Sequence, residues 1–349
     1  MARRRKRIAI GFPIVHSVQG GAEVLVSSLQ SALAGKGHNV FGIEIPFNFS
    51  PVKQLIRDCI AWRLLDLTKS YLTPYDIFIA TKFPSYVARH PNKVVYLMHQ
   101  HREVYELWGS RYSQLKSSEE DLGIRDAIIS IDNRALAEAK SIFTISKRVS
   151  ERLRRYNGLE SKVLYPPPRL GNVFRCEAYE PFVFCPGRLE LNKRLDLVLD
   201  ALARCKAEIR CVIAGTGPQE RALKKQARKL KLGERVDFAG WVDDKTLVDL
   251  YARCMGVVFA PKDEDLGFIT LEAFLSKKPV ITTETSGAVL EFVEDGVTGY
   301  VASTEPGALA EKIDLLAAHP KRAGKMGEAG YETARKLTWD YVVDHLTAG

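Results

Sequence analysis

Residues 210–218 read RCVIAGTGP, and residues 219–230 continue as QERALKKQARKL. The opening apolar run is typical of a buried strand, the glycines predict a turn, and the residues after them have helical periodicity. The same order of strand, glycine turn and helix recurs over residues 182–203. Such a succession favours a parallel, doubly wound α/β sheet with buried strands.

The alternation extends through most of the chain. In the first half, the predicted strands cover residues 8–10, 40–43, 77–80, 94–97, 142–145 and 162–165, and the predicted helices cover 23–34 and 147–156. In the second half, strands are predicted over 182–185, 210–214, 235–238, 256–260 and 279–281, and helices over 195–203, 219–230, 245–253 and 270–275. Each half therefore predicts its own sheet.

A break between the halves comes at Pro166-Pro167-Pro168, which neither a helix nor a central strand accommodates. The residues that follow, up to Tyr179, have little periodicity. A chain of 349 residues also exceeds what one hydrophobic core usually organises. We expect a doubly wound domain over residues 1–168, a linker over 169–180 and a second doubly wound domain over 181–335.

The composition is that of a globular protein, with 46% hydrophobic and 27% charged residues. No apolar run reaches the roughly 18–20 residues that a membrane span needs. The basic N-terminus leads into the first strand without an apolar stretch of signal-peptide length. We therefore expect a cytoplasmic protein. The six cysteines form no Cys-x-x-Cys pair, which favours buried free thiols over disulfides or a zinc site.

The net charge of +9 is uneven, with +11 in residues 1–170 and −2 in the remainder. A basic half can attract nucleic acid or an anionic membrane. The sequence has no basic stripe interleaved with aromatics, no zinc finger and no RNP-type motif, which argues against nucleic acid. Residues 52–71 combine cations with apolar side chains. They predict either an interfacial membrane helix or, more commonly, an amphipathic helix packed on its own sheet.

Glycine turns after predicted strands are candidate anion sites. Gly20-Gly21 follows the first strand and precedes a helix, although the Gly-x-Gly-x-x-Gly fingerprint is not met. Gly187-Arg188 follows the strand at 182–185, with Lys193 five residues later. Cations on such a loop suit a diphosphate, since arginine forms a bidentate fork and lysine a point charge. For each motif taken alone, a plain turn or a solvated loop is an equal alternative.

A third turn contains Gly215 and Gly217, which can line a nucleotide pocket or simply cap the next helix. The nearby residues 238–242 (FAGWV) would place Trp241 and the backbone of Val242 beside a base.

The most informative segment is EDLGFITLEAF at residues 264–274. Gly267 allows a tight turn, and the helix that follows would offer anionic oxygens the amides of Phe268, Ile269 and Thr270. Glu264 before the turn and Glu272 on the helix could bind sugar and ribose hydroxyls. A pair of surface glutamates is the alternative for this spacing in isolation.

Together these motifs resemble family 4 of the retaining glycosyltransferases. The shared features are Gly-Gly-Ala-Glu at 20–23, Gly-Arg at 187–188 with Lys193, Ala-Gly-Thr-Gly-Pro at 214–218, Glu-x7-Glu at 264–272, Ser286-Gly287 and residues 294–299. The resemblance is close over 181–303. It is sparser in the N-terminal half, at residues 20–23, 36–38, 99 and 165–167.

The resemblance implies a GT-B fold, in which two facing Rossmann-like domains border a central cleft. The first domain would take the acceptor, the second would bind the nucleotide sugar, and residues 336–349 would form a helix that crosses back to the first. Arg188 and Lys193 would bind the diphosphate and Glu272 the ribose. Glu264 and the amides after it would contact the transferred sugar and the phosphates, with Gly20 and Gly21 approaching the phosphates from the other domain.

His99 matches a family histidine near the donor sugar, but His101 is two residues away and leaves the assignment ambiguous. Arg194 stands where glycine is commoner in the family, and Leu266 where phenylalanine is common. Residues 263–265 (DED) match the Asp-x-Asp of metal-dependent glycosyltransferases. That match overlaps Glu-x7-Glu, and cations already serve the phosphates, so we expect neither a metal nor another cofactor.

The predicted reaction is the transfer of a sugar from a nucleoside diphosphate sugar to an acceptor hydroxyl with retention of anomeric configuration. The acceptor would be a polysaccharide or lipid-linked glycan, and the protein could bind peripherally at the inner face of an anionic membrane. A catalytically silent nucleotide-sugar-binding partner subunit is the main alternative. A GT-B phosphorylase would generally need a larger chain, and a nucleic-acid-binding protein explains only the charge.

Overall fold

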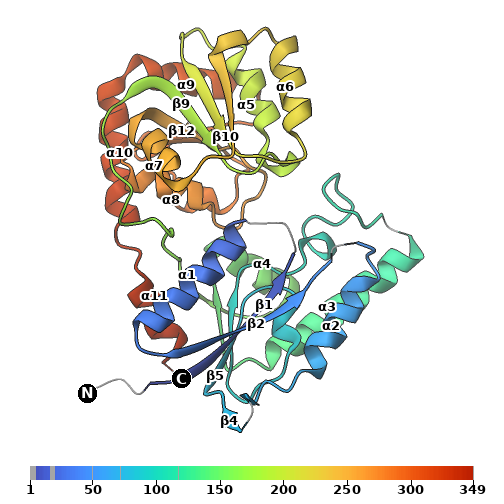
Figure 1. Cartoon of the computed structure of the whole chain (residues 1–349). Helices are drawn as coiled ribbons and strands as arrows, with labels where there is room; N and C mark the ends of the chain where they lie inside the picture. Colours follow the sequence, from blue (N-terminus) through green and yellow to red (C-terminus); the bar gives the residue numbers. More distant parts are fainter. Residues whose placement is uncertain (1–4, 16–19, 49, 71, 117, 349) are drawn as a thin grey trace. The chain divides into compact units, whose positions relative to one another are not determined.

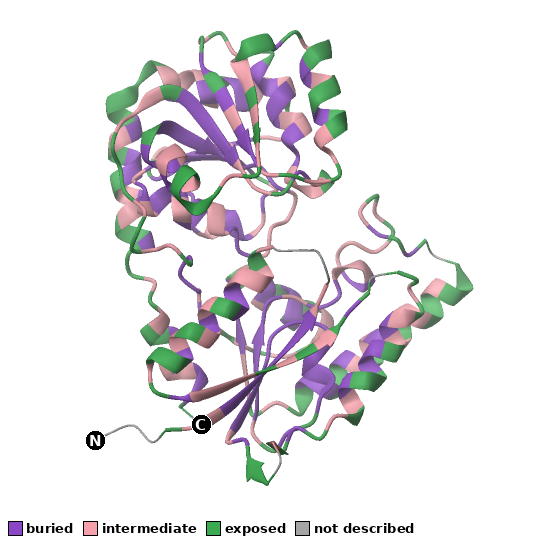
Figure 2. Cartoon of the chain, viewed as in Figure 1, coloured by how far each residue is buried: buried purple, intermediate pink, exposed green. Residues whose placement is uncertain are grey.

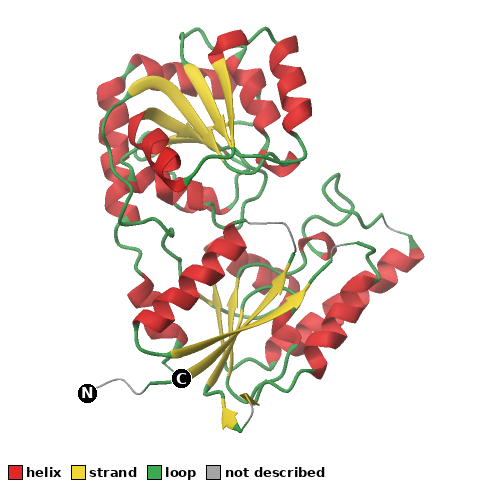
Figure 3. Cartoon of the chain, in the orientation of Figure 1, coloured by secondary structure: helices red, strands yellow, loops and turns green. Residues whose placement is uncertain are grey.

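The computed structural model describes residues 5–15, 20–48, 50–70, 72–116 and 118–348. The chain forms two compact units, one of Met1–Pro166 with Thr338–Gly349 and the other of Pro167–Leu337. Each unit contains a six-stranded parallel sheet with helices packed against it (Figures 1 and 3). The predicted α/β class with two doubly wound sheets is therefore confirmed.

The sheet of the first unit has the order β2-β1-β5-β6-β7-β8. Its strands are β1 (Arg7–Ile14), β2 (Asn39–Pro46), β5 (Ile77–Ala80), β6 (Lys93–Leu97), β7 (Ser141–Thr144) and β8 (Lys162–Val163). All residues of β5 and β6 are buried, as expected for parallel strands covered on both faces. The chain moves outward from β1 in both directions, so the strand order reverses between β1 and β5.

The helices of this unit are α1 (Gly21–Gly35), α2 (Gln54–Leu64), α3 (Glu119–Ala137), α4 (Lys147–Asn157) and α11 (Trp339–Leu346). A short antiparallel pair, β3 (Lys69–Ser70) and β4 (Thr73–Pro74), follows α2. The C-terminal α11 lies beside α1 (Figure 1), where Lys36 Nζ is 3.0 Å from the Asp340 carboxylate. In addition, Lys6 Nζ donates to the Thr347 carbonyl at 2.7 Å, so the last residues belong to the first unit.

The helix expected over residues 52–71 is shorter than predicted. It ends at Leu64, and Asp66 accepts a hydrogen bond from the Thr68 amide at 3.0 Å, which closes a turn instead. Leu55, Cys59 and Trp62 are buried on one face of α2. The helix thus packs within its own unit, which was the commoner of the two alternatives.

The sheet of the second unit has the order β11-β10-β9-β12-β13-β14. Its strands are β9 (Glu180–Pro186), β10 (Arg210–Ala214), β11 (Val236–Gly240), β12 (Cys254–Val258), β13 (Val280–Thr283) and β14 (Gly299–Ala302). Its helices are α5 (Leu195–Leu202), α6 (Glu220–Lys229), α7 (Asp244–Arg253), α8 (Phe268–Leu275), α9 (Pro306–Ala318) and α10 (Pro320–Ala334). Figure 2 shows the central strands of each sheet as buried, whereas the edge strands β2 and β11 are half-buried to exposed.

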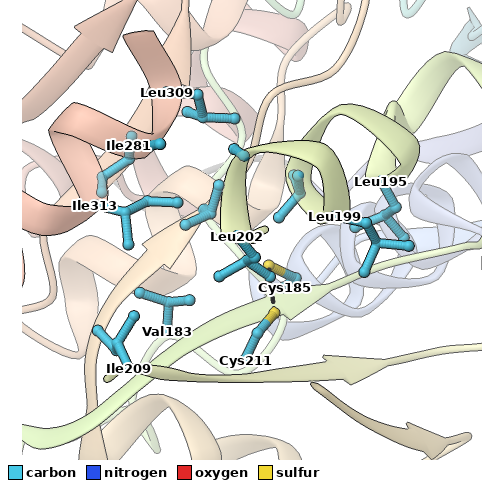
Figure 4. Close-up of a cluster of buried hydrophobic side chains, with 14 of the residues drawn as sticks. Val183, Cys185, Leu195, Leu199, Leu202, Ile209, Cys211, Ile281, Leu309 and Ile313 are labelled. Carbon is cyan, nitrogen blue, oxygen red and sulfur yellow. Dashed lines mark hydrogen bonds between the residues drawn. The ribbon is translucent and has the colours of Figure 1, made fainter. Parts of the chain in front are cut away.

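The core of the second unit joins β9 and β10 to α5 and α9 (Figure 4). Leu199 and Leu202 of α5 and Ile313 of α9 are fully buried there. The Sγ atoms of Cys185 and Cys211 lie 3.6 Å apart in this core. All six cysteines are free thiols and four of them are buried, as predicted.

The stretch after the prolines has no regular element up to β9, yet it packs on the second unit. The amides of Glu177 and Ala178 both donate to the carbonyl of Ala252 at the end of α7. Arg169 forms a bidentate pair with Asp244 in the first turn of that helix, at 2.8 and 2.5 Å. Within the described residues, none of the helices combines the length and the apolarity needed to span a bilayer.

Candidate functional site

The candidate residues of the second unit lie on loops that follow β9, β10 and β12. Because these parallel strands are neighbours in the sheet, their carboxyl ends meet at one edge. The loops bond to one another through their backbones. The Gly187 amide donates to the Ala214 carbonyl and the Leu189 amide to the Thr216 carbonyl, each at 2.9 Å. The loop carrying Arg188 is therefore held against the turn after β10.

Gly215 and Gly217 make this close approach possible. A Cβ on Gly215, whose φ is +136°, would lie 2.0 Å from the Gly187 carbonyl oxygen. A Cβ on Gly217 would lie 2.6 Å from the Leu189 carbonyl oxygen. The geometry thus gives both glycines a packing role, and their predicted contact with a donor stays a prediction.

Lys193 and Glu264, both predicted as site residues, meet in the structure. Lys193 Nζ donates to Glu264 Oε2 at 2.7 Å, and each side chain is 19% exposed. The ammonium also lies 5.7 Å from the centre of the Phe259 ring. A partly exposed cation and a carboxylate are thus fixed together at the edge of the sheet, where a ligand can reach both.

Arg194 has a role that the sequence did not indicate. Its φ is +51°, in the left-handed region that favours glycine, which is the commoner residue here in the family. The buried guanidinium donates to the carbonyls of Ala260 and Pro261 at 2.8 and 2.9 Å and to Thr283 Oγ1 at 2.5 Å. Arg194 therefore ties the loop of Lys193 to the ends of β12 and β13, and it contacts the framework rather than a ligand.

The backbone at Glu264 is fixed by Ser286-Gly287. The Glu264 amide donates to the Ser286 carbonyl at 3.2 Å, and the Ala288 amide donates to the Glu264 carbonyl at 2.9 Å. Gly287 has a φ of +67°, and a Cβ there would lie 2.5 Å from the Glu264 carbonyl oxygen. Glycine is required at this position so that the two segments can pair.

The turn at Gly267 and the start of α8 agree with the prediction, with one correction. Gly267 has a φ of +81° and precedes Phe268, the first residue of the helix. The Thr270 amide, predicted to serve a ligand, instead donates to the Gly267 carbonyl at 2.9 Å. The first two helical amides, those of Phe268 and Ile269, precede the point where intrahelical bonding begins and so remain the candidates for anionic oxygens.

Glu272 is half-buried on α8, and it is held by Tyr251, a residue that no sequence motif indicates. The hydroxyl of Tyr251 on α7 donates to Glu272 Oε2 at 2.7 Å. Burial raises the pKa of the Glu272 carboxyl, while this hydrogen bond and the charge of Arg169 act in the opposite direction. No local pattern links Tyr251 to Glu272, since the two residues lie on different helices.

Arg188 and Trp241 are more exposed than the other candidates. The Arg188 guanidinium pairs with the carboxylate of Glu190, and its side chain is 43% exposed. Trp241 follows β11 and is 76% exposed, with Val242 half-buried beside it in sequence. An exposed arginine and an exposed aromatic on loops at strand ends can each adjust to a ligand.

Gly20, Gly21 and His99 belong to the first unit. The Gly20 amide donates to Glu23 Oε2 at 2.8 Å, and Glu23 also pairs with Lys82 at 3.4 Å, so the start of α1 is firmly capped. Residues 16–19 of the predicted glycine turn lie outside the described part of the chain. The predicted donor contacts of Gly20 and Gly21 stay predictions.

His99 and His101, the two candidates for the histidine near the donor sugar, differ in burial. His101 is buried against the ring of Phe83, 5.2 Å between centroids, and burial lowers its pKa to about 3. His99 is half-buried, with Nδ1 2.7 Å from the Gln100 carbonyl oxygen. Of the two side chains, His99 is the more accessible to a ligand, and its role stays a prediction.

Comparison with known proteins covers both the sequence and the fold. The profile of the family described as "Glycosyl transferases group 1" matches residues 175–333. A human alpha-1,3/1,6-mannosyltransferase, ALG2, is 31% identical over 161 residues, which cover 41% of this chain and 38% of that protein. A GDP-mannose-dependent alpha-(1-6)-phosphatidylinositol monomannoside mannosyltransferase of Mycolicibacterium smegmatis is 32% identical over 161 residues, covering 43% and 42%. The matched region thus spans about two fifths of these relatives.

Solved structures match nearly the whole chain. Anabaena Alr3699/HepE in complex with UDP and glucose has a TM-score of 0.72 at 18% identity, covering 99% of this chain and 98% of that one. Sucrose-phosphate synthase of Thermosynechococcus elongatus has a TM-score of 0.79 at 19% identity, with the same coverage. The fold is the GT-B type. Residues 175–333 match the glycosyl transferases group 1, and the resemblance to family 4 is thereby confirmed.

We predict that Gly215→Ala disrupts the packing of the loops after β9 and β10. The added Cβ meets backbone atoms of Gly187, so the change should cost more than about 2 kcal/mol. Gly233→Ala is the matched control, because Gly233 has a φ of +48° but open space around its Cβ position. It should cost about 1 kcal/mol. The midpoint of thermal unfolding measures both, and equal midpoints would contradict the packing role.

Proposed function

We propose that this chain is a retaining glycosyltransferase that moves a sugar from a nucleoside diphosphate sugar to an acceptor hydroxyl. The observation that carries the proposal is the Lys193–Glu264 pair on the loops beside the first amides of α8. A cation, a carboxylate and helix amides at one sheet edge suit a phosphate joined to a sugar. The charges would bind the diphosphate and the carboxylate would accept sugar hydroxyls.

The individual roles follow from the chemistry of each group. Arg188 would bind the diphosphate as a fork, and Lys193 has two ammonium protons left beyond the one that Glu264 accepts. The amides of Phe268 and Ile269 would receive phosphate oxygens. Glu272 would accept the ribose hydroxyls, and Trp241 with Val242 would contact the base. We propose no metal ion, because these groups supply the positive charge that the leaving diphosphate needs.

The reaction itself is proposed to occur on one face of the sugar. The bond between the anomeric carbon and the phosphate oxygen breaks, the acceptor oxygen bonds to the same carbon from the same side, and the acceptor proton passes to the departing phosphate. This route needs no covalent nucleophile. His99, Gly20 and Gly21 are proposed as further donor contacts from the first unit.

The donor and acceptor classes are inferred from relatives. The mycobacterial relative is named for GDP-mannose and a phosphatidylinositol mannoside, and the Anabaena structure contains UDP. We propose a UDP- or GDP-sugar donor and a lipid-linked glycan or polysaccharide acceptor. A silent nucleotide-sugar-binding subunit is the competing function, and hydrolysis of a bound donor without acceptor would distinguish the enzyme from the binder.

We predict that Arg188→Ala and Lys193→Ala each lower turnover about a hundredfold or more, since each removes a preorganised charge from the leaving group. The assay uses whichever UDP- or GDP-sugar protects the protein from thermal unfolding. Such a ligand at about 100 times its Kd adds about 2.7 kcal/mol. Lys229→Ala, an exposed change on α6, is the control and should retain wild-type turnover. Near-normal turnover in both site variants would refute the assignment.

Although α2 packs on its own unit through one face, we also propose that its exposed face docks the first unit on an anionic membrane at the inner face. Ile60 and Leu64 on α2 are 52% and 79% exposed, in the half of the sequence that is strongly basic. The double change Ile60→Ser with Leu64→Ser should reduce flotation with phosphatidylglycerol vesicles, because apolar contact is lost. Val297→Ser, at a 45% exposed position of the second unit, should have no effect. Equal flotation of the wild type with neutral phosphatidylcholine vesicles would contradict the proposal.

A further inference from the structure

Tyr251 is rigidly placed beside Glu272. Its side chain is fully buried, and its ring packs edge-on against Phe184, 5.0 Å between centroids, and against Phe174, 5.4 Å. The two interplanar angles are 88° and 84°. These contacts fix the ring from β9 and from the segment before it, so the hydroxyl has one position, 2.7 Å from Glu272 Oε2.

The hydrogen bond from Tyr251 involves only Oε2 of the Glu272 carboxylate, and Oε1 is the second oxygen. An ionised carboxylate can accept on about four lone-pair sites, and the bond from Tyr251 occupies one of them on Oε2. It also fixes the rotation of the carboxylate plane. Oε1 is thereby given a defined orientation, which is what recognition of a vicinal diol such as ribose requires.

The charges facing Glu272 come from two segments. Arg169, before β9, lowers the pKa of the Glu272 carboxyl, and Asp244 on α7 raises it, while Arg169 and Asp244 form a bidentate pair with each other. Burial is the largest cause and raises the pKa. Asp244 offsets the effect of the Arg169 charge on Glu272. The hydrogen bond from the uncharged Tyr251 hydroxyl is therefore the main contact that favours the ionised form of the Glu272 carboxyl.

We infer that Tyr251 is a positioning residue of the donor site, whose hydroxyl orients the Glu272 carboxylate to accept the ribose hydroxyls of the nucleotide sugar. This inference rests on the proposed function. Tyr251 would not contact the donor itself. It would act only through Glu272, and its hydrogen bond would lower the pH at which donor binding is lost.

The test is the Tyr251→Phe variant, which keeps the ring contacts and removes only the hydroxyl. We expect the Kd for UDP or GDP, measured by calorimetry, to rise about tenfold, the size of one hydrogen bond to a charged group. KM for the donor should rise with it, and kcat at saturating donor should stay close to that of the wild type. Losing the bond raises the pKa of Glu272, so the acid limb of the binding profile should move to higher pH.

Controls separate positioning from packing. Tyr179→Phe also removes one hydroxyl of the second unit, which donates to the Lys277 carbonyl at 2.7 Å, and should leave affinity and pH profile unchanged. Glu272→Gln should abolish the acid limb attributed to Glu272. In the double variant, Tyr251→Phe should add nothing to the loss caused by Glu272→Gln, because both changes remove the same contact.

The outcomes are distinguishable. Wild-type affinity and an unshifted acid limb in Tyr251→Phe would overturn the inference, as would fully additive losses in the double variant. Retention of the acid limb in Glu272→Gln would overturn it even if Tyr251→Phe proved poorly folded. If the wild type bound neither nucleotide nor any of their sugars, the proposed function would fail, and this inference with it.

Discussion

The site of the second unit depends on backbone segments that pack more closely than side chains allow. Gly215 approaches Gly187, Gly217 approaches Leu189, and Gly287 approaches Glu264, in each case at distances that a Cβ would obstruct. These approaches let the amide and carbonyl groups of successive loops bond directly. The charged side chains then project from a framework whose position is set by backbone hydrogen bonds. Such preorganisation would stabilise a leaving diphosphate.

On this framework, opposite charges are placed next to each other. Lys193 pairs with Glu264, and Arg188 pairs with Glu190. Both cations are therefore already partnered by a carboxylate before an anionic ligand binds. A diphosphate would exchange these partners or share them. Such pairing lowers the cost of holding the cations close together, and it leaves their charge available to phosphate oxygens.

Much of the fold and several site residues could be predicted from the sequence, because they are encoded by residues close together in the chain. The apolar runs and glycine turns identified both sheets, and Gly267 before an apolar helical segment located the start of α8 within two residues. The Glu264 to Glu272 spacing and the loop cations combined into a resemblance that the family match then confirmed. Each of these features depends on residues within one short segment, so a sequence pattern can reveal it.

The contacts that could not be predicted join residues that are distant in the sequence. Arg194 bonds to Thr283, 89 residues away, and Tyr251 bonds to Glu272 from another helix. Neither contact leaves a periodic or motif signal. The Thr270 amide was assigned to a ligand because its bond to Gly267 depends on how tightly the turn closes. The helix at 52–71 was predicted too long because the turn at Asp66 competes with helical periodicity.

We propose that the strand-end loops of the second unit hold the diphosphate of the donor. Amide hydrogen–deuterium exchange with and without a bound UDP- or GDP-sugar measures whether these loops are protected by the ligand. We expect protection on binding to include residues 187–194 and the amides of Phe268 and Ile269, with exchange in α6 unchanged. Tight binding without any change at residues 187–194 and 264–272 would contradict it.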